Sequence, residues 1–277
     1  MPQPDRTEEL KASLAERILV LDGAMGTTIR TYGLSEEDAR GERFKDCEKD
    51  LLNNGDILSL TRPDVISDIH KRFYEAGSDI CETNTFSATS IAQSEFFLED
   101  PRETGGRKDP EFFQKVIENQ FLKKLAWEMN VESARLCREA ADRVSEETGR
   151  PRYVAGAIGP LTVSLTNSPD PEDTAFRVVT FDQVKTAYKE QVEALIEGGC
   201  DILMIETIFD SLNAKAAAVA VREVFEEQGR HLPVIISAAV GRGGETMISA
   251  QKVEAVWNAF AHTKPLALGL NCSLGPD

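Results

Sequence analysis

Residues 197–207 read EGGCDILMIET, and residues 75–83 read EAGSDICET. Each stretch combines the end of an amphipathic helix, a glycine turn and a short apolar run that closes in Glu-Thr. Recurrent units of this kind indicate strands connected by helices, as in a (β/α) barrel or a doubly wound sheet. The GxGxxG fingerprint of a dinucleotide-binding fold is missing, because the nearest candidate, residues 23–26, has the wrong spacing. A barrel is therefore the preferred fold.

Further apolar runs extend this rhythm along the chain. Runs this apolar suggest strands that are buried on both faces, as in parallel sheets. The six strand candidates are residues 17–22 (RILVLD), 79–83 (DICET), 153–158 (YVAGAI), 201–207 (DILMIET), 234–240 (VIISAAV) and 266–272 (LALGLNC).

The segments between the strand candidates predict helices with identifiable ends. Residues 64–76 place apolar side chains on one face, and Gly77 is a natural C-terminal stop. Polar residues that can cap the first turn mark other helix starts. The expected caps are Thr180, in a capping box with Gln183, Ser211, for a helix to about residue 229, and Ser249.

The domain organisation follows from the same rhythm. Residues 1–16 are expected to form a helical or flexible lead-in, and residues 17–277 a barrel domain. Residues 99–120 interrupt the pattern, because they are polar and contain two prolines and a Gly-Gly pair. We expect a surface insertion there, without a chemical role.

The composition excludes several classes of function. The 47 acidic and 31 basic residues give a net charge of −16, which disfavours binding to nucleic acid or to an anionic membrane surface. No apolar stretch approaches the roughly 20 residues that span a bilayer, and the N-terminus has no apolar signal region. Five widely spaced cysteines without a CxxC pair argue against a disulfide framework and a zinc knuckle. A reducing, cytoplasmic location is expected.

Candidate site residues lie where strands end, because a barrel gathers its chemistry at the carboxyl ends of its strands. Asp22 and Glu206 each close an apolar run, where a carboxylate is costly unless it is paired. Two such carboxylates facing one cavity would suit the ammonium group of an amino acid, although each could equally be a capping or supporting carboxylate. Cys272 differs from the other cysteines by its position at a strand end, since a buried cysteine is usually a small hydrophobe.

Several motifs together resemble a known family. The chain is similar to the homocysteine-binding domain of cobalamin-dependent methionine synthases, within the wider homocysteine S-methyltransferase family. The segments that carry the resemblance occur in the family's order. They are residues 21–27 (LDGAMGT), 41–46 (GERFKD), 56–66 (DILSLTRPDVI), 75–86 (EAGSDICETNTF), 153–160 (YVAGAIGP), 206–217 (ETIFDSLNAKAA) and 269–277 (GLNCSLGPD). Residues 41–46 and 56–66 look most like the methionine synthase branch.

The resemblance implies a (β/α)8 barrel of the TIM type, of which about six of the eight βα units are present. It implies that Asp22, the Gly23 backbone and Glu206 hold the amino-acid end of homocysteine, and that Thr83 and Asn84 line the pocket. Family members hold Zn²⁺ with three cysteines, of which Cys272 matches the first. The other two form a Gly-Gly-Cys-Cys segment that this sequence lacks.

The implied reaction transfers a methyl group from methylcobalamin, ultimately from methyltetrahydrofolate, to zinc-bound homocysteine and gives methionine. Thiolates are the good nucleophiles, and zinc keeps the sulfur deprotonated. The implied partners are cobalamin- and folate-binding domains of a full-length protein, so the chain alone is expected to be an inactive fragment with weak zinc binding. Two alternatives stay open: a stand-alone methyltransferase that uses betaine or S-methylmethionine, and a non-catalytic amino-acid-binding module.

Overall fold

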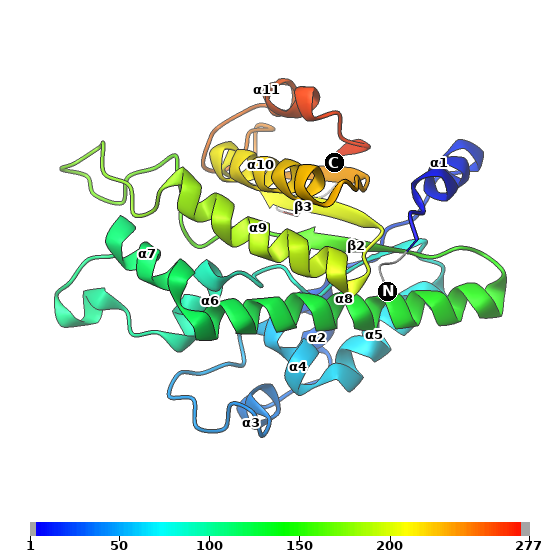
Figure 1. Ribbon diagram of the computed structural model, residues 1–277, viewed down its shortest axis with the longest axis horizontal. Helices are drawn as coiled ribbons and strands as arrows, with labels where there is room; N and C mark the ends of the chain where they lie inside the picture. Colours follow the sequence, from blue (N-terminus) through cyan, green and yellow to red (C-terminus); the bar gives the residue numbers. More distant parts are fainter. Residues whose placement is uncertain (1–3, 273–277) are drawn as a thin grey trace.

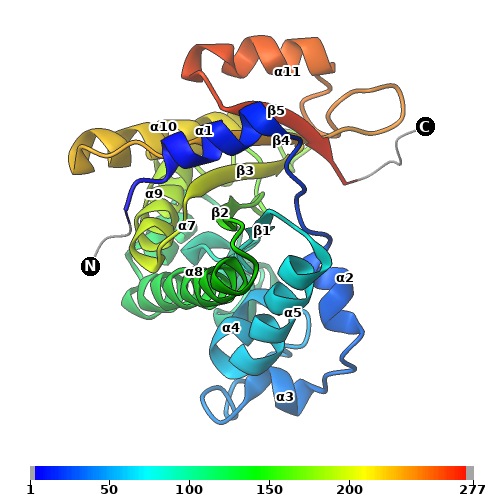
Figure 2. The same ribbon diagram turned by 90° about the vertical axis from the view of Figure 1, so that its right-hand side faces the viewer.

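A parallel sheet of five strands, in the order β1-β2-β3-β4-β5, organises the computed structural model, which describes residues 4–272 (Figure 1). The sheet curls into a half-barrel, seen almost end-on in Figure 2. The strands are β1 (Ile80–Glu82), β2 (Tyr153–Ile158), β3 (Ile202–Ile208), β4 (Val234–Ala239) and β5 (Ala267–Asn271). The α/β fold class and the incomplete TIM-type barrel are thereby confirmed.

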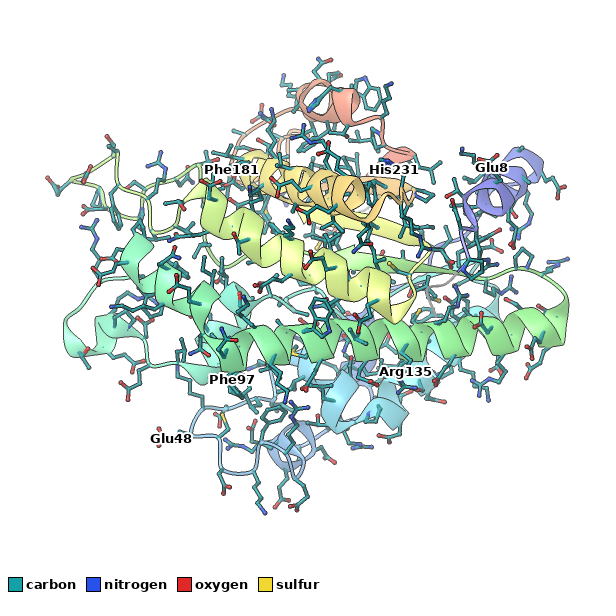
Figure 3. All side chains as sticks on the ribbon, in the orientation of Figure 1. Glu8, Glu48, Phe97, Arg135, Phe181 and His231 are labelled. Atoms are coloured by element: carbon teal, nitrogen blue, oxygen red, sulfur yellow. The ribbon has the colours of Figure 1, made fainter. Side chains whose placement is uncertain are left out.

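Helices connect the strands, and those from residue 63 onward pack against the outer face of the sheet. The α-helices are α1 (Thr7–Glu16), α2 (Met25–Arg30), α3 (Glu36–Arg40), α4 (Leu58–Thr61), α5 (Pro63–Ala76), α6 (Ser90–Phe97), α7 (Pro110–Glu118), α8 (Gln120–Thr148), α9 (Phe181–Gly198), α10 (Ser211–Gln228) and α11 (Val253–Phe260). Short 3₁₀ turns are η1 (Gly55–Ile57), η2 (Pro101–Thr104) and η3 (Ala261–Thr263). Figure 3 shows that Phe181 opens α9 and that Arg135 lies on the middle of α8.

Two apolar clusters sandwich the sheet. On the outer face, strand residues such as Leu203 and Ile236 pack against the helices. On the concave face, alternate strand residues such as Tyr153 and Ile202 pack around Leu10 of α1. This alternation is the pleat of a strand buried on both faces, as predicted. Helix α1 therefore covers the inside of the half-barrel at the amino ends of the strands.

The helix ends confirm two of the sequence predictions. Thr180 and Gln183 form the expected capping box at the start of α9. Helix α5 ends at Gly77, whose φ of 114° is left-handed and suits glycine.

Two predicted caps are wrong, because nearby residues take the role. Asp210, rather than Ser211, caps α10, since its carboxylate accepts from the amides of Leu212 and Asn213. Ser249 lies before α11 in a turn, hydrogen-bonded to Thr246, and the helix starts after Lys252.

The predicted first strand, residues 17–22, is not a regular strand in the structure. Leu21 forms a single parallel bridge with Ile80, and the Val20 carbonyl accepts from the amides of Asp79 and Ile80. Ile18 and Val20 are exposed, so this segment pairs on one side and lies at an edge. The count among residues 4–272 is therefore five strands, not six.

The segment 99–120 is a surface insertion only in its first half. Residues 102–107 are exposed, but α7 buries Phe113, Val116 and Ile117 in the core. Their spacing, i, i+3 and i+4, is that of a helix face. The prolines and glycines around them had hidden this pattern in the sequence.

A network of ion pairs closes the amino ends of the strands. Asp79 precedes β1 and binds Arg17 with both carboxylate oxygens, at 2.6 and 2.7 Å. Asp201 precedes β3 and binds Arg138, with 2.5 Å between Oδ2 and the guanidinium. Each aspartate also accepts a backbone amide from the preceding strand or edge segment, Val20 or Val154. The sequence repeat thus recurs as a repeated structural contact.

Candidate functional site

Three carboxylates meet on the concave side at the carboxyl ends of the strands. Asp22 follows the edge segment, Glu82 ends β1 and Glu206 lies in β3. The amide of Glu82 donates to Asp22 Oδ2 at 3.1 Å. Burial raises the pKa of Asp22 to about 8, and the charge of Glu82 adds to the shift. This arrangement favours a shared proton or a bound cation over three separate charges.

The carboxyl groups of Glu82 and Glu206 lie close together. Burial raises the pKa of both groups. The charge of Glu82 raises the pKa of Glu206 further, and that of Asp22 adds a smaller effect. Two glutamates from strands that are not neighbours in the sheet therefore lie close enough for the charge of one to raise the pKa of the other.

The pleat of β3 places Glu206 on the concave side with Ile202 and Met204, and a β-bulge disturbs the strand at this point. The pairing with β4 shifts between Ile205 and Ile208, which both belong to the outer core cluster. Glu206 and Thr207 lie between them and turn toward the concave side, with a positive φ of 55° at Thr207. A β-branched residue in this left-handed region is an outlier, and such outliers concentrate at functional sites.

Side chains from β4 and β5 join the site through hydrogen bonds. The Thr207 hydroxyl donates to Glu206 Oε2 at 3.2 Å. Asn271 Nδ2 donates to the Thr207 oxygen at 2.7 Å, and Ser237 Oγ donates to Asn271 Oδ1 at 3.1 Å. Cys272 follows Asn271 directly, is exposed, and has a positive φ of 59°.

The other predicted pocket residues have structural contacts in this arrangement. Thr83 Oγ1 accepts the amide of Ala157 and so continues the β1–β2 pairing. Asn84 Nδ2 donates to the Gly55 carbonyl at 2.9 Å, toward η1. Gly23 lies exposed beside Asp22, and a side chain there would contact the Phe73 ring at 3.1 Å. The structure therefore brings Asp22, Gly23, Glu206 and the Cys272 strand end to one edge, while Thr83 and Asn84 support that edge.

The sequence profile of the homocysteine S-methyltransferase family matches residues 19–277. The chain belongs to this family. Its motifs, from residue 21 onward, had predicted this membership, and the prediction is confirmed at the level of the family.

Solved structures of another member have the same fold. The metallated form of the homocysteine methyltransferase MmuM from Escherichia coli superposes with a TM-score of 0.65 at 20% identity, over 95% of this chain and 77% of that one. Its oxidised form gives 0.65 at 21% identity, over 95% and 76%. Its apo form gives 0.61 at 20% identity, over 95% and 75%. At this identity the likeness establishes the fold.

Glu82 belongs to the carboxylate cluster, although the sequence prediction did not select it. Its neighbours Thr83 and Asn84 were selected instead, from the same strand end. A signal was present, since both repeat units close in Glu-Thr and the second glutamate, Glu206, was selected. The contact between the two glutamates depends on the curl of the sheet, which the sequence does not reveal.

The donor side chains of the described residues do not assemble a metal centre. Between residues 4 and 272, no three His, Cys, Asp or Glu side chains are grouped so as to hold a metal ion. Cys81, Cys137 and Cys200 are buried, and burial raises the pKa of each thiol. Cys272 is thus the thiol placed at the carboxylate edge, and the described residues alone do not fit a zinc centre.

Other features lie away from this edge. A cavity of about 670 Å³ opens between α10 and α11 and is lined by residues such as Phe225, Leu232 and Phe260, with none of the three carboxylates.

Within the described part of the chain, no helix has the length and apolar character of a membrane span.

Proposed function

We propose that this chain binds homocysteine and presents its thiol for methylation. The observation that carries the proposal is the cluster of Asp22, Glu82 and Glu206 at the carboxyl ends of the strands, where Glu206 is buried and the other two carboxylates are half-buried. Such a cluster is costly when empty and is relieved by a cation. The ammonium group of an amino acid supplies that charge and three hydrogen-bond donors. Family membership narrows the amino acid to homocysteine.

Each end of homocysteine has a proposed partner at this edge. Asp22 and Glu206 hold the ammonium group, with Glu82 beside them, and the exposed amide of Gly23 is placed to donate to the substrate carboxylate. Thr83 and Asn84 line the pocket wall. The thiol then extends toward Cys272, at the end of β5. These residues bind and orient the substrate, which is their part in the reaction.

For the methyl donor, we favour methylcobalamin carried by another domain of a methionine synthase, because residues 41–46 and 56–66 resemble that branch. Betaine or S-methylmethionine is the alternative for a stand-alone enzyme, and a non-catalytic amino-acid-binding module is the third possibility. Cys272 would supply one ligand to Zn²⁺, which keeps a bound thiol deprotonated. The other ligands would come from outside residues 4–272. A cytoplasmic location fits the free thiols.

Replacing Glu206 with glutamine should weaken homocysteine binding by about 10- to 100-fold, the usual cost of losing a charge-assisted hydrogen bond. Isothermal titration calorimetry in a reducing buffer would measure the dissociation constant. Glu226→Gln, on the exposed face of α10, is the matched control and should bind like the wild type. Equal affinities of Glu206→Gln and wild type would contradict the proposed ammonium site. No binding to the wild-type chain would contradict the whole proposal.

The contribution of Asp22 to the stability of the ligand-free protein should fall as the pH rises from about 4 to 8. Over this range Asp22 ionises in the unfolded chain but stays protonated in the folded one, so rising pH favours unfolding. Asp22→Asn removes this effect. Its melting temperature should exceed that of the wild type at pH 8, with a smaller difference at pH 5. The exposed Asp50→Asn should show no such trend in thermal melts. A pH-independent difference for Asp22→Asn would count against the raised pKa.

A further inference from the structure

A directional hydrogen-bond chain leads across three strands to Glu206. It starts at Ser237 in β4, passes through Asn271 in β5 and ends through Thr207 at Glu206 in β3. The Thr207 oxygen already accepts from Asn271, so its own proton is free to point at the carboxylate. The side-chain amide of Asn271 accepts from Ser237 through Oδ1 and donates to Thr207 through Nδ2. Successive bonds of this kind strengthen one another.

The same chain holds two unusual backbone positions. Thr207 and Cys272 both have positive φ values, of 55° and 59°, although neither is glycine. Such conformations persist only where the surroundings fix them. Asn271 contacts the first of these residues through its side chain and precedes the second in the chain. It therefore links the direction of the Glu206 carboxylate to the position of the Cys272 thiol.

We propose that Asn271 is a positioning residue for the substrate amine, which acts through Thr207 on Glu206. The inference rests on the proposed homocysteine site and adds a residue that does not itself touch substrate. With the Asn271–Thr207 bond in place, Glu206 faces the ammonium group from a fixed direction, while the next residue fixes the thiol end. Without it, Glu206 loses its orientation although its charge remains.

The test compares homocysteine with 4-mercaptobutanoate, which keeps the thiol and carboxylate but lacks the amino group. Titration calorimetry would give both dissociation constants for the wild type, Asn271→Ala, Thr207→Val and Thr207→Ser. The wild type should prefer homocysteine by about tenfold or more, as expected for a charged hydrogen-bonded group. In Asn271→Ala and Thr207→Val this preference should fall by about fivefold or more, as for directly coupled groups. Thr207→Ser keeps the hydroxyl and should retain the wild-type preference for homocysteine.

A purely structural role would change the binding of both ligands equally and leave the preference intact, which would overturn the inference. Thr263→Val removes a similar hydroxyl, bonded to the Phe260 carbonyl beyond α11, and serves as the control. Thermal melts identify any variant that fails to fold, and the Thr207 pair then decides alone. If the wild type binds homocysteine but Thr207→Val keeps the preference, only this inference fails. If the wild type shows no preference for homocysteine, both this inference and the proposed ammonium site are contradicted.

Discussion

Gly159→Ala should destabilise the protein by about 3 kcal/mol or more, at the upper end of the cost of overpacking. A Cβ atom at this position would lie 2.1 Å from the carbonyl oxygen of Phe86 and 2.9 Å from its carbonyl carbon. The clash is with backbone, so a side-chain rotation cannot relieve it. The segment that carries Phe86 cannot retreat easily, because Thr85 Oγ1 donates to the Ala157 carbonyl at 2.7 Å.

Urea unfolding monitored by circular dichroism would measure this loss. Gly26→Ala is the matched control, since a Cβ there meets nothing within 4 Å and the residue lies in helix α2. That variant should be neutral or slightly more stable, because alanine favours a helix over glycine. A Gly159→Ala protein with the midpoint of the wild type would show that the loop after β1 moves freely.

Asp201→Asn should cost about 3–5 kcal/mol of stability, as breaking one side of a buried ion pair usually does. The substitution keeps the shape, removes the buried charge partner of the Arg138 guanidinium and leaves the exposed Asp142 as its remaining carboxylate. Asp142→Asn is the matched control, because Asp142 pairs with the same arginine from an exposed position and should cost below about 1 kcal/mol.

A double-mutant cycle with Arg138→Met separates the charge from the packing. Removing both charges should restore part of the stability lost in Asp201→Asn, since a buried pair can be replaced by apolar groups. Chemical unfolding of the four proteins gives the coupling energy. Strict additivity of the two substitutions would mean that this ion pair contributes nothing specific to the fold.

Much of the fold could be predicted because it depends on local patterns. The strands β2, β3 and β4 were found from apolar runs alone, and α9 from its capping box. The edge segment 17–22 has the same apolar character, but strand formation also requires a partner, and it pairs only with β1. Helix α7 was missed because prolines and glycines surround its buried face. Sequence patterns show which segments can be buried, but tertiary contacts determine which of them are buried in the fold.

The site was predictable in part for the same reason. Asp22 and Glu206 stood out as carboxylates at the ends of apolar runs, and the structure groups them. Glu82 also follows a short apolar run, but it joins the other two carboxylates because the sheet curves and brings the end of β1 toward β3. The bulge at Thr207 and the amide of Asn271 depend on registers between strands that are far apart in sequence. Such contacts have no signature within a single stretch of sequence.

Helix α1 has a practical consequence for making recombinant versions of this domain. The family match begins at residue 19, so a gene cut at that boundary would omit residues 7–16. Leu10 would then no longer cover Tyr153 and Ile202, and Arg6 would no longer reach the Arg152 carbonyl. We expect water to reach the concave cluster at the amino ends of the strands. A domain boundary taken from the family match would therefore remove the helix that covers the concave apolar cluster.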